Sequence, residues 1–419
     1  MAQPSQPAIV VIGCGAIGLP LAVALASRGA SVLGIDADPA RVADLTAGRT
    51  ALGDSGLAEA LRTGLEEGGL GFSAVLNTAP DERAYVLAVP TPARADGAFD
   101  TGPIEAAMAA VSAAARRDEL VCVRSTIPIG ATRALAGAYA SAGLMFAACP
   151  DRSVAGNAYA EQFSLPHVVG GLGDTAGVRA AAIFAHLGTV VRAPDPETAE
   201  AIKLFANVQR DVSFALANQF ALISEAAGID LAVVRQVGAA GFPRFSLARP
   251  GPVGGPCLTK DLALLLASAG LESVDTRLLS AARSLNESLA DRIAAAVETE
   301  LAERPGQAVA ILGLAFKGTP PTGDQRGAFA AALCERLVGR LPKLDLRRWD
   351  PVAEPPAGRA AAVRRAGVVV LANDHPDLAI GLDAELSADA VVFDLTGLVG
   401  PGAGFASKRF GNGAAPTRS

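Results

Sequence analysis

Short apolar runs alternate with helix-compatible segments in the first part of the chain. The run AIVVI at 8–12 leads into a glycine-rich turn, a helical pattern over 19–28 and a second apolar run, SVLGID. This order is typical of a parallel βαβ unit. Strand-like runs at 84–89 and 119–123, with alanine-rich segments between them, continue the alternation. We therefore predict a doubly wound parallel sheet in a domain spanning 1–195.

The pattern changes at Pro196. After it, no proline or glycine interrupts a helical stretch that reaches about Gly228, which is long enough to span roughly 45 Å. We predict a central helical domain over 196–300. The runs AVAILG, KLDLRRWD, AGVVVLA and AVVFDL then predict a second α/β domain over 301–410, and the polar residues 411–419 predict a flexible tail. The expected fold class is α/β, with two Rossmann-like doubly wound domains joined by a long central helix.

Composition excludes several classes of protein. Apolar residues make up 51% of the 419, but no apolar run approaches the roughly 18 to 20 residues of a membrane span. The start, MAQPSQPAIVVIG, lacks the basic segment of a secretory signal, so we expect a cytoplasmic protein. A net charge of -6 with scattered basic residues gives no footprint for nucleic acid or an anionic membrane.

The cysteines and histidines show no metal-binding spacing. The cysteines are Cys14, Cys122, Cys149, Cys257 and Cys334, and the histidines are His167, His186 and His375. All lie far apart in the sequence, unlike the ligands of a zinc site or the cysteines of a redox dithiol. We therefore expect no metal site and no disulfide.

A glycine-rich turn separates the first predicted strand from the first predicted helix. Gly13, Gly15 and Gly18 form the pattern G-x-G-x-x-G, with Cys14, Ala16 and Ile17 between them. In this context the first glycine permits the tight turn, the second lets the backbone approach a pyrophosphate, and the third allows close packing of helix on strand. The start of the helix attracts the phosphate charge. The turn predicts a dinucleotide site.

Two residues bear on the choice of dinucleotide. Asp36 ends the second predicted strand, where a carboxylate can accept hydrogen bonds from both ribose hydroxyls and would repel a 2′-phosphate. The alternative for Asp36 is a solvated strand end. NAD is favoured over NADP, although Arg41, five residues on, weakens that preference.

Two proline-containing loops follow later strands. VPTP occupies 89–92 and STIPIG occupies 125–130. Sheets of this kind bind ligands at the carboxyl ends of their strands, so these loops are candidates for contact with the dinucleotide. The candidate residues are Val89, Pro90, Thr91, Ser125 and Thr126. Ordinary turns also contain proline, and that interpretation stays open.

The segment GPVGGPCLTKD at 251–261 places Cys257 directly before a helical pattern. The positive end of a helix dipole, with Lys260 one turn on, favours the thiolate over the thiol, whose reference pKa is about 8.5. Asp261 falls on the same helical face and could polarise a water molecule. The alternative is that Cys257 is a small buried apolar residue. The charged pair beside it favours a nucleophile.

The long helical stretch carries a polar stripe. Glu200, Lys203, Asn207 and Arg210 follow 3-4-3 spacing and share one face. The stripe is either the solvated side of an amphipathic helix or the wall of a cleft. In a cleft, Lys203 and Asn207 could transfer a proton or stabilise an alkoxide.

Three signatures in this order resemble the UDP-glucose and GDP-mannose dehydrogenase family. They are the G-x-G-x-x-G turn, the Lys-x-x-x-Asn-x-x-Arg helix and GGPCLTKD. The stretches ETAEAIKLFANVQRDVSFALANQ, ILGLAFKG and TGDQR extend the resemblance over nearly the whole chain. FPRFSLARPGPVGGPC and CPDRSVAG are most similar to the UDP-N-acetylmannosamine dehydrogenase branch.

The resemblance implies a two-step oxidation of a sugar hydroxymethyl group to a carboxylate, with consumption of two NAD. Cys257 would capture the aldehyde as a thiohemiacetal, which is oxidised to a thioester and hydrolysed. Lys203, Asn207 and Asp261 match the positions for proton transfer, oxyanion stabilisation and water activation. Thr126 matches a threonine near the nicotinamide.

The resemblance also implies binding residues and an assembly. Substrate contacts would come from Arg152, Ser153, Lys203, Asn207, Arg210, Gly254, Phe316 and Lys317. Arg244 would reach the substrate from a neighbouring subunit, and Arg326 would approach NAD. A homodimer or larger homo-oligomer follows by analogy with the family's long helix.

This sequence departs from the family at three places. Asp151 stands where the family has glutamate, which shortens a carboxylate on the catalytic face. Thr396 stands where the family has lysine or arginine, which removes one cationic contact to the nucleotide sugar. The stretch from FKG to TGDQR is two residues longer than usual. Together these departures suggest an unusual substrate.

Two other functions fit part of the pattern. A Rossmann dehydrogenase acting once on a small hydroxy acid or alcohol would form one NADH per substrate and would tolerate Cys257→Ala. A catalytically silent NAD-binding protein would bind the dinucleotide without turnover. Neither function requires the complete set of lysine, asparagine, cysteine and aspartate.

Overall fold

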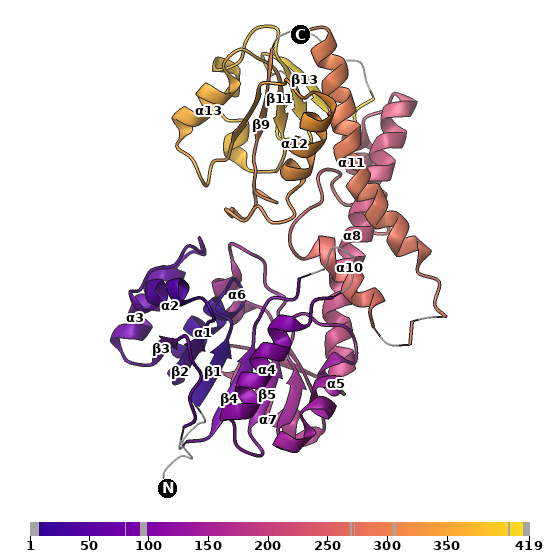
Figure 1. Cartoon of the computed structure of the whole chain (residues 1–419). Coiled ribbons are helices and arrows are strands. Elements are labelled where there is room, and N and C mark those ends of the chain that lie inside the picture. Colours follow the sequence, from indigo (N-terminus) through magenta and orange to yellow (C-terminus); the bar gives the residue numbers. More distant parts are fainter. Residues whose placement is uncertain are drawn as a thin grey trace. The chain divides into compact units, whose positions relative to one another are not determined.

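The computed structural model describes residues 8–79, 81–92, 99–268, 270–271, 273–304, 307–400 and 403–413. The chain divides into two compact units. Unit 1 comprises 1–206 and 260–274, and unit 2 comprises 207–259 and 275–419. Residues 196–300, predicted as a central helical domain, are therefore shared between the two units. Figure 1 shows the elements in chain order by colour.

Unit 1 is built on an eight-stranded sheet with the order β3-β2-β1-β4-β5-β6-β7-β8. Its strands are β1 (Ala8–Ile12), β2 (Val32–Ile35), β3 (Leu70–Ser73), β4 (Arg83–Leu87), β5 (Leu120–Val123), β6 (Met145–Ala148), β7 (His167–Gly171) and β8 (Val190–Ala193). All neighbouring pairs are parallel except β6 and β7. The order reverses between β1 and β4, which is where doubly wound sheets bind ligands.

Helices cover both faces of this sheet (Figure 1). They are α1 (Gly18–Ala26), α2 (Pro39–Thr46), α3 (Leu57–Glu66), α4 (Gly102–Ala114), α5 (Ala131–Ala138), α6 (Ala158–Ser164) and α7 (Asp174–Ala185). Alternate residues of β1 enter different cores: Ile9 and Val11 pack in one cluster, whereas Val10 and Ile12 pack in another. A sheet buried on both faces requires continuous apolar runs, which explains the run AIVVI.

Unit 2 contains a five-stranded parallel sheet with the order β10-β9-β11-β12-β13. Its strands are β9 (Ala308–Leu312), β10 (Leu346–Trp349), β11 (Ala366–Leu371), β12 (Val391–Asp394) and β13 (Ala406–Arg409). Helix α12 (Phe329–Arg340) connects β9 to β10, and α13 (Pro356–Val363) connects β10 to β11. Val309 and Ile311 pack on one face of this sheet, and Ala310 and Leu312 on the other. The predicted fold class is confirmed: both sheets are doubly wound.

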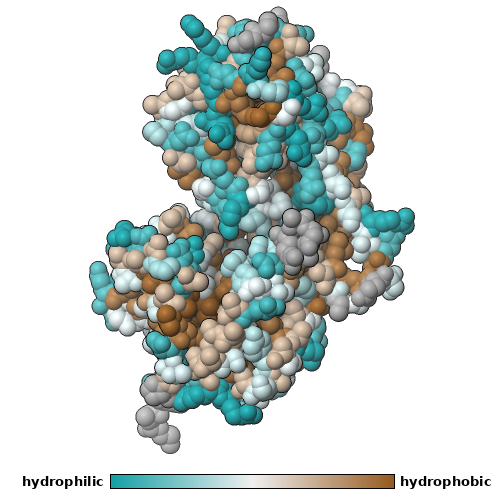
Figure 2. All heavy atoms as spheres, viewed as in Figure 1, coloured by the Kyte–Doolittle hydropathy of each residue, from teal (hydrophilic) through white to brown (hydrophobic). Residues whose placement is uncertain are grey.

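Four further helices carry the central part of the chain. They are α8 (Pro196–Ala227), α9 (Leu231–Ala239), α10 (Leu258–Leu266) and α11 (Arg277–Ala302). The predicted long helix from Pro196 matches α8 to within a residue. Among the described residues, no helix combines the length and the apolar character needed to cross a membrane. Figure 2 shows apolar side chains in separate patches among hydrophilic ones on the face in view.

Backbone hydrogen bonds hold the first residues of the predicted tail within unit 2. The N–H of Leu231 donates to the carbonyl of Gly411 at 3.0 Å, and the N–H of Gly413 donates to the carbonyl of Ile229 at 3.0 Å. The first residues of the predicted tail are therefore bonded to the turn between α8 and α9. Residues 414–419 lie outside the described part of the chain.

Candidate active site

The glycine-rich turn between β1 and α1 has the geometry of a dinucleotide cradle. A side chain at Gly13, whose φ is +92°, would place its Cβ 2.6 Å from the carbonyl oxygen of Ala88. A Cβ on Gly18 would lie 1.8 Å from the carbonyl oxygen of Gly13. Apart from the residues next to it in the chain, no described residue has an atom within 4 Å of a Cβ built on Gly15. The chain therefore fills the space at the first and third glycines and leaves the second open, which fits the approach of a pyrophosphate.

Asp36 lies beside this turn and is buried. The carboxylate of Asp36 accepts hydrogen bonds from the backbone N–H of Cys14 at 2.9 Å and from the backbone N–H of Asp38 at 3.0 Å. Arg41 Nη1 lies 3.0 Å from Oδ2 of the same carboxylate. Burial alone would raise the pKa of Asp36, but these hydrogen bonds and the Arg41 guanidinium outweigh it and lower the pKa. The carboxylate is thus ionised and fixed at the end of β2, as a ribose acceptor must be.

The two proline-containing loops adjoin each other at the ends of β4 and β5. The hydroxyl of Ser125 donates to the carbonyl of Val89 at 2.7 Å. Lys260 Nζ donates to Thr91 Oγ1 at 3.3 Å and to Asp261 Oδ1 at 2.9 Å. Pro90 is exposed beside them. The structure therefore brings together predicted residues from both loops and from α10, all within unit 1.

In unit 1, the loop at 125–130 and the helix α8 line the same small cavity. It is lined by Val123, Ser125, Thr126, Ile127, Ala148, Pro150, Glu200 and Lys203. Glu200 accepts hydrogen bonds from the backbone N–H groups of Gly130 at 2.6 Å and Thr132 at 2.8 Å, which ties α8 to the start of α5. Burial is the main cause that raises the pKa of Glu200. Lys203 and Thr126 therefore line the same cavity.

The polar stripe of α8 is buried rather than solvated. Glu200, Lys203 and Asn207 are each less than 9% exposed, and the stripe continues to Asp211 and Asn218. Arg210, grouped with this face from its spacing, is exposed, and its guanidinium lies 6.0 Å from the ring of Phe214. The interpretation of the stripe as a solvated face is therefore wrong.

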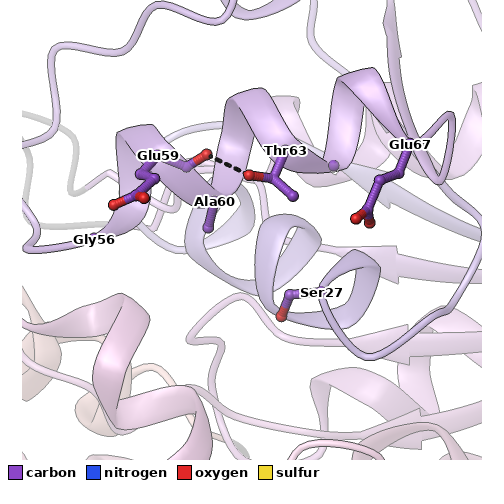
Figure 3. A pocket seen from close by; sticks show the side chains of 7 residues that line it. Ser27, Gly56, Glu59, Ala60, Thr63 and Glu67 are labelled. Carbon is purple, nitrogen blue, oxygen red and sulfur yellow. Dashed lines mark hydrogen bonds between the residues drawn. The ribbon is translucent and has the colours of Figure 1, made fainter.

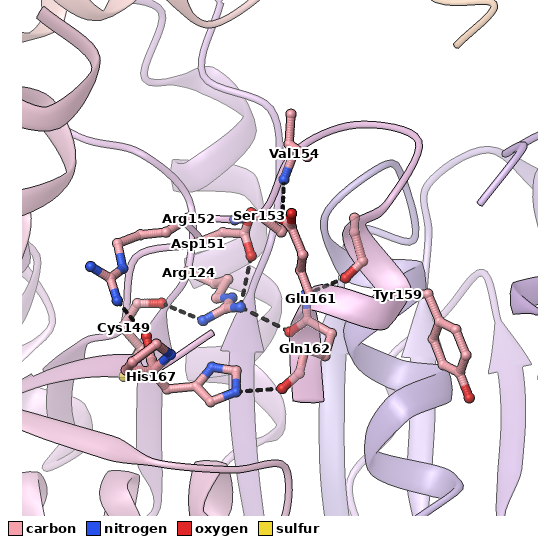
Figure 4. A network of polar contacts seen from close by, with 12 residues as sticks. Arg124, Cys149, Asp151, Arg152, Ser153, Val154, Tyr159, Glu161, Gln162 and His167 are labelled. Atoms are coloured by element: carbon pink, nitrogen blue, oxygen red, sulfur yellow. Dashed lines mark hydrogen bonds and ion pairs between the residues drawn. The ribbon is translucent and has the colours of Figure 1, made fainter. Parts of the chain in front are cut away.

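Asp151 belongs to a buried polar network, shown in Figure 4. Arg124 Nη2 donates to Asp151 Oδ1 at 2.7 Å and to Gln162 Oε1 at 3.0 Å. The hydroxyl and N–H of Ser153 donate to Asp151 Oδ2 at 2.7 and 3.1 Å. Burial alone would raise the pKa of Asp151, but Arg124 and then Lys203 outweigh it and lower the pKa. Both oxygens of this carboxylate therefore bond to groups of the chain.

The neighbouring residues of this loop differ in exposure. Arg152 is exposed, and its guanidinium donates to the carbonyl of Pro166 at 2.6 Å. Ser153 is half-buried. The Asp151 network thus holds the backbone from which these two predicted substrate contacts project.

Cys257 is the exposed cysteine of the five; the other four are buried, and none of the five forms a disulfide. It directly precedes α10, as predicted. A Cβ on Gly254 would lie 2.6 Å from the carbonyl oxygen of Gly327, and one on Gly255 would lie 2.5 Å from the ring of Phe316. These close contacts explain why the segment before the cysteine is rich in glycine.

Within unit 2 the structure gathers several predicted residues around this segment. Phe316 packs against Gly255, and Lys317 Nζ lies 5.7 Å from the Phe316 ring centroid. Arg326 forms a bidentate ion pair with Asp324, and this pair outweighs the opposing effect of burial and raises the pKa of Arg326, with a smaller contribution from Cys257. Phe316 therefore packs on the cysteine segment, Lys317 lies beside Phe316, and Arg326 interacts electrostatically with Cys257.

Arg244 and Thr396 are the remaining positions singled out from the sequence. Arg244 is exposed, and its guanidinium stacks 4.6 Å from the ring of Phe242. Thr396 donates its hydroxyl to the carbonyl of Asn373 at 3.2 Å. Gly251 lies against this turn, because a Cβ there would be 2.8 Å from the carbonyl oxygen of Leu395. The segment that leads to Cys257 thus starts beside Thr396.

Sequence reasoning missed two groups of buried polar residues. The first is Arg124, Gln162 and His167 in the Asp151 network, and the second is Asp211, Asn218, Arg283 and Asn286 between α8 and α11. Asp211 and Asn218 continue the polar stripe at helical spacing, so extending that pattern along α8 would have found them. The partners on other elements give no such signal.

A surface hollow in unit 1 carries none of the predicted residues. It is lined by Ser27, Gly56, Glu59, Ala60, Thr63, Gly64 and Glu67, and Figure 3 shows it beside α3. The hydroxyl of Thr63 donates to the carbonyl of Glu59 at 3.2 Å. The hollow therefore uses ordinary helix surface and does not belong to the candidate site.

The sequence matches two domains of one known protein family. Residues 7–188 match the NAD binding domain of the UDP-glucose/GDP-mannose dehydrogenase family, and residues 197–288 match its central domain. The UDP-N-acetyl-D-mannosamine dehydrogenase of Salmonella typhi is 31% identical over 354 residues, which cover 79% of this chain and 82% of the relative. The NDP-N-acetyl-D-galactosaminuronic acid dehydrogenase of Ralstonia nicotianae is 29% identical over 416 residues, which cover 93% and 96%.

Solved structures agree with the sequence matches. The UDP-D-ManNAc dehydrogenase of Pyrococcus horikoshii has a TM-score of 0.86 at 28% identity, and the match covers 97% of this chain and 100% of that one. The UDP-glucose dehydrogenase of Pyrobaculum islandicum has a TM-score of 0.84 at 27% identity, with 99% and 100% covered. The predictions of an oxidoreductase and of NAD as its cofactor are confirmed. The chain belongs to the UDP-glucose/GDP-mannose dehydrogenase family.

Proposed function

We propose that this enzyme oxidises the 6-hydroxymethyl group of a nucleotide-linked hexose or N-acetylhexosamine to the uronic acid. The observation that carries the proposal is the exposed thiol of Cys257 at the start of α10, on a glycine-rich segment packed against Phe316. An accessible thiol at a helix start is suited to covalent catalysis, whereas the other four cysteines are buried. The names of the relatives favour an N-acetylhexosamine as the sugar.

Binding of NAD is assigned to the turn at Gly13, Gly15 and Gly18 and to Asp36. When bound, NAD supplies a hydride acceptor for each of the two oxidation steps. Further contacts are assigned to Arg41, to Arg326, and to the loops that hold Val89, Pro90, Thr91, Ser125 and Thr126. The open face at Gly15 and the fixed carboxylate of Asp36 support this assignment.

The chain's own residues supply the proton and acyl chemistry. Lys203 would accept the proton of the reacting hydroxyl, and Asn207 would stabilise the oxyanion. The Cys257 thiolate would add to the aldehyde carbon to give a thiohemiacetal. Loss of a hydride and a proton from that adduct leaves a thioester, and a water molecule releases the acid and the thiol. The carboxylate of Asp261, paired with Lys260, is assigned the activation of that water.

Asp151 is assigned a positioning role within this scheme. Its oxygens already accept from Arg124 and Ser153, so it supports the loop that bears Arg152 and Ser153. Substrate contacts are also assigned to Arg210, Gly254, Phe316 and Lys317, and to Arg244 of a second copy.

A homodimer is supported by the apolar side of α8. Phe205, Leu216, Phe220 and Ile223 lie on one face of the helix, and Phe205 is 56% exposed. Val233, Val234 and Val237 on α9 are exposed as well. Exposed apolar side chains in this number mark an interaction surface. A cytoplasmic location agrees with five cysteines that form no disulfide, since disulfides are rare in that compartment.

The test is a panel of nucleotide sugars offered with NAD to the wild-type enzyme and to Cys257→Ser. We expect the wild type to form two NADH per uronic acid, as measured by absorbance and by mass spectrometry of the product. Cys257→Ser should lose acid formation. One NADH per substrate, with full activity in the variant, would favour a single-step alcohol or hydroxy-acid dehydrogenase. Binding of NAD without turnover of any sugar would favour a catalytically silent protein.

A further inference from the structure

A chain of buried polar side chains joins α8 to α11 in unit 2. Asp211 and Asn218 come from α8, and Arg283 and Asn286 come from α11; all are less than 9% exposed. Asn286 Nδ2 donates to the carboxylate and to the backbone carbonyl of Asp211, at 2.9 and 3.0 Å. Asn218 Nδ2 donates to Asn286 Oδ1 at 3.0 Å. The four residues therefore form one connected network.

One end of this network holds the start of the cysteine segment. The side chain of Asn218 binds the peptide groups of Gly251 on both sides: its Oδ1 accepts from the N–H at 2.8 Å, and its Nδ2 donates to the carbonyl at 3.1 Å. Gly251 has φ +146°, and a Cβ built on it would lie 2.8 Å from the carbonyl oxygen of Leu395. The backbone at this position is thus fixed by directional bonds as well as by packing.

The other end of the network holds the residue after the cysteine. Arg283 Nη1 donates to Asp211 Oδ1 at 2.8 Å and to the backbone carbonyl of Leu258 at 3.4 Å. Leu258 directly follows Cys257 and begins α10. The segment 251–258 is therefore anchored at both ends to the same buried network.

The middle of the segment is held separately. The N–H of Gly255 donates to the carbonyl of Gly327 at 2.8 Å, and the Thr259 hydroxyl donates to the carbonyl of Gly255 at 2.8 Å. Cys257 nevertheless remains exposed. A reactive thiol on a glycine-rich segment needs such anchoring, because glycine gives the backbone more freedom than any other residue.

We propose that Asn218 and Arg283 are positioning residues that fix the segment 251–258 and thereby hold the Cys257 thiol in its attacking position. The inference rests on the proposed covalent role of Cys257. Apolar side chains could fill the same space, but only directional hydrogen bonds set the orientation of the Gly251 and Leu258 peptide groups. Small displacements of a reacting group cost large factors in rate.

The experiment compares Asn218→Ala and Arg283→Lys with the wild type and with Ser224→Ala. Ser224 is a matched control, because it is also buried on α8 and forms no part of the network. Hydrogen exchange measured by mass spectrometry follows the amides of 251–258, and steady-state kinetics with NAD and the accepted nucleotide sugar give kcat and KM. Arg283→Lys keeps the charge beside Asp211 and provides a second variant if Asn218→Ala does not fold.

We expect faster exchange confined to 251–258 and the residues of the network, with kcat reduced at least about tenfold and KM changed less than about threefold. Ser224→Ala should change none of these. A variant that exchanges faster but keeps wild-type kcat would overturn the positioning role, and so would a general loss of protection without a local effect. Failure of the wild type to oxidise any nucleotide sugar would instead refute the proposed function and the catalytic purpose of the anchoring with it.

Discussion

The guanidinium of Arg41 contacts both carboxylate oxygens of Asp36, at 3.2 and 3.0 Å, from the helix that follows the second strand. The ion pair places a cation beside the position assigned to the NAD ribose. A carboxylate there excludes a 2′-phosphate, whereas a free arginine attracts one. The preference for NAD over NADP therefore depends on the acid remaining charged and the arginine remaining paired.

Asp36→Asn should weaken this preference. The amide oxygen can still accept from Cys14 or Asp38, but the negative charge is lost and Arg41 loses its ionic partner. We expect the ratio of kcat/KM for NAD to that for NADP to fall at least tenfold, an effect of about 1.4 kcal/mol. Adding Arg41→Ala should remove the gain with NADP. An unchanged ratio in Asp36→Asn would show that other residues select the cofactor.

Arg124 and Asp151 form a buried ion pair whose side chains are 3% and 4% exposed. Removing one partner of such a pair leaves an uncompensated buried charge, so Arg124→Met should lower the free energy of unfolding by about 3 to 5 kcal/mol. Adding Asp151→Asn should recover part of this loss. Urea denaturation of the single and double variants measures both effects.

The exposed pair Arg277 and Asp275 provides the control for this comparison, since its side chains are 91% and 60% exposed. Arg277→Met should leave the denaturation midpoint unchanged, because exposed pairs contribute little. If Arg124→Met behaved like Arg277→Met, the Asp151 network would not hold its loop in the way its bonds indicate.

The sequence predicts the parts of this site that depend on local pattern. The turn at Gly13 to Gly18, the acid at Asp36 and the length of α8 all follow from spacing along the chain, and the structure has each where it was expected. Cys257 before α10 follows in the same way. Local pattern succeeds here because each feature is set by neighbours within a few residues.

Features that depend on distant partners could not be predicted. Spacing alone does not say which side of an amphipathic helix is covered, and in α8 the polar side is buried while Phe205 and Leu216 are exposed. Arg124 follows a strand, and its partner Asp151 lies 27 positions away. Arg283 and Leu258 meet because α11 returns along α8. Such pairs arise from tertiary packing, which no pattern within a single element specifies.

His167 should make stability depend on pH between about 6.5 and 4. Its ring Nε2 lies 2.8 Å from the carbonyl of Gln162, and burial, then the charge of Arg124, lowers its pKa from 6.5 to about 4. The folded state thus disfavours the protonated ring. Its contribution to stability is complete above the unfolded pKa of 6.5 and is lost as the pH falls towards 4.

The comparison is between the wild type and His167→Asn, measured by chemical denaturation at several pH values. Between pH 7 and pH 4 the wild type should lose about 2 kcal/mol more than the variant, after allowance for partial solvent screening. Parallel curves for the two proteins would mean that the histidine is not held neutral by its surroundings.

Gly15→Ala and Gly13→Ala should separate cofactor binding from folding. A Cβ on Gly15 meets no atom of the described residues beyond its chain neighbours within 4 Å, so the free energy of unfolding of this variant should lie within about 1 kcal/mol of the wild type. Its methyl group would occupy the open side of the turn, and the Kd for NAD should rise at least tenfold, because the backbone there must approach the pyrophosphate.

Gly13→Ala, in contrast, places its Cβ 2.6 Å from the carbonyl oxygen of Ala88 at φ +92° and should lower the unfolding temperature itself. Calorimetric titration with NAD and thermal denaturation measure the two effects independently. An NAD affinity equal to the wild type in Gly15→Ala would mean that the pyrophosphate does not lie over this turn.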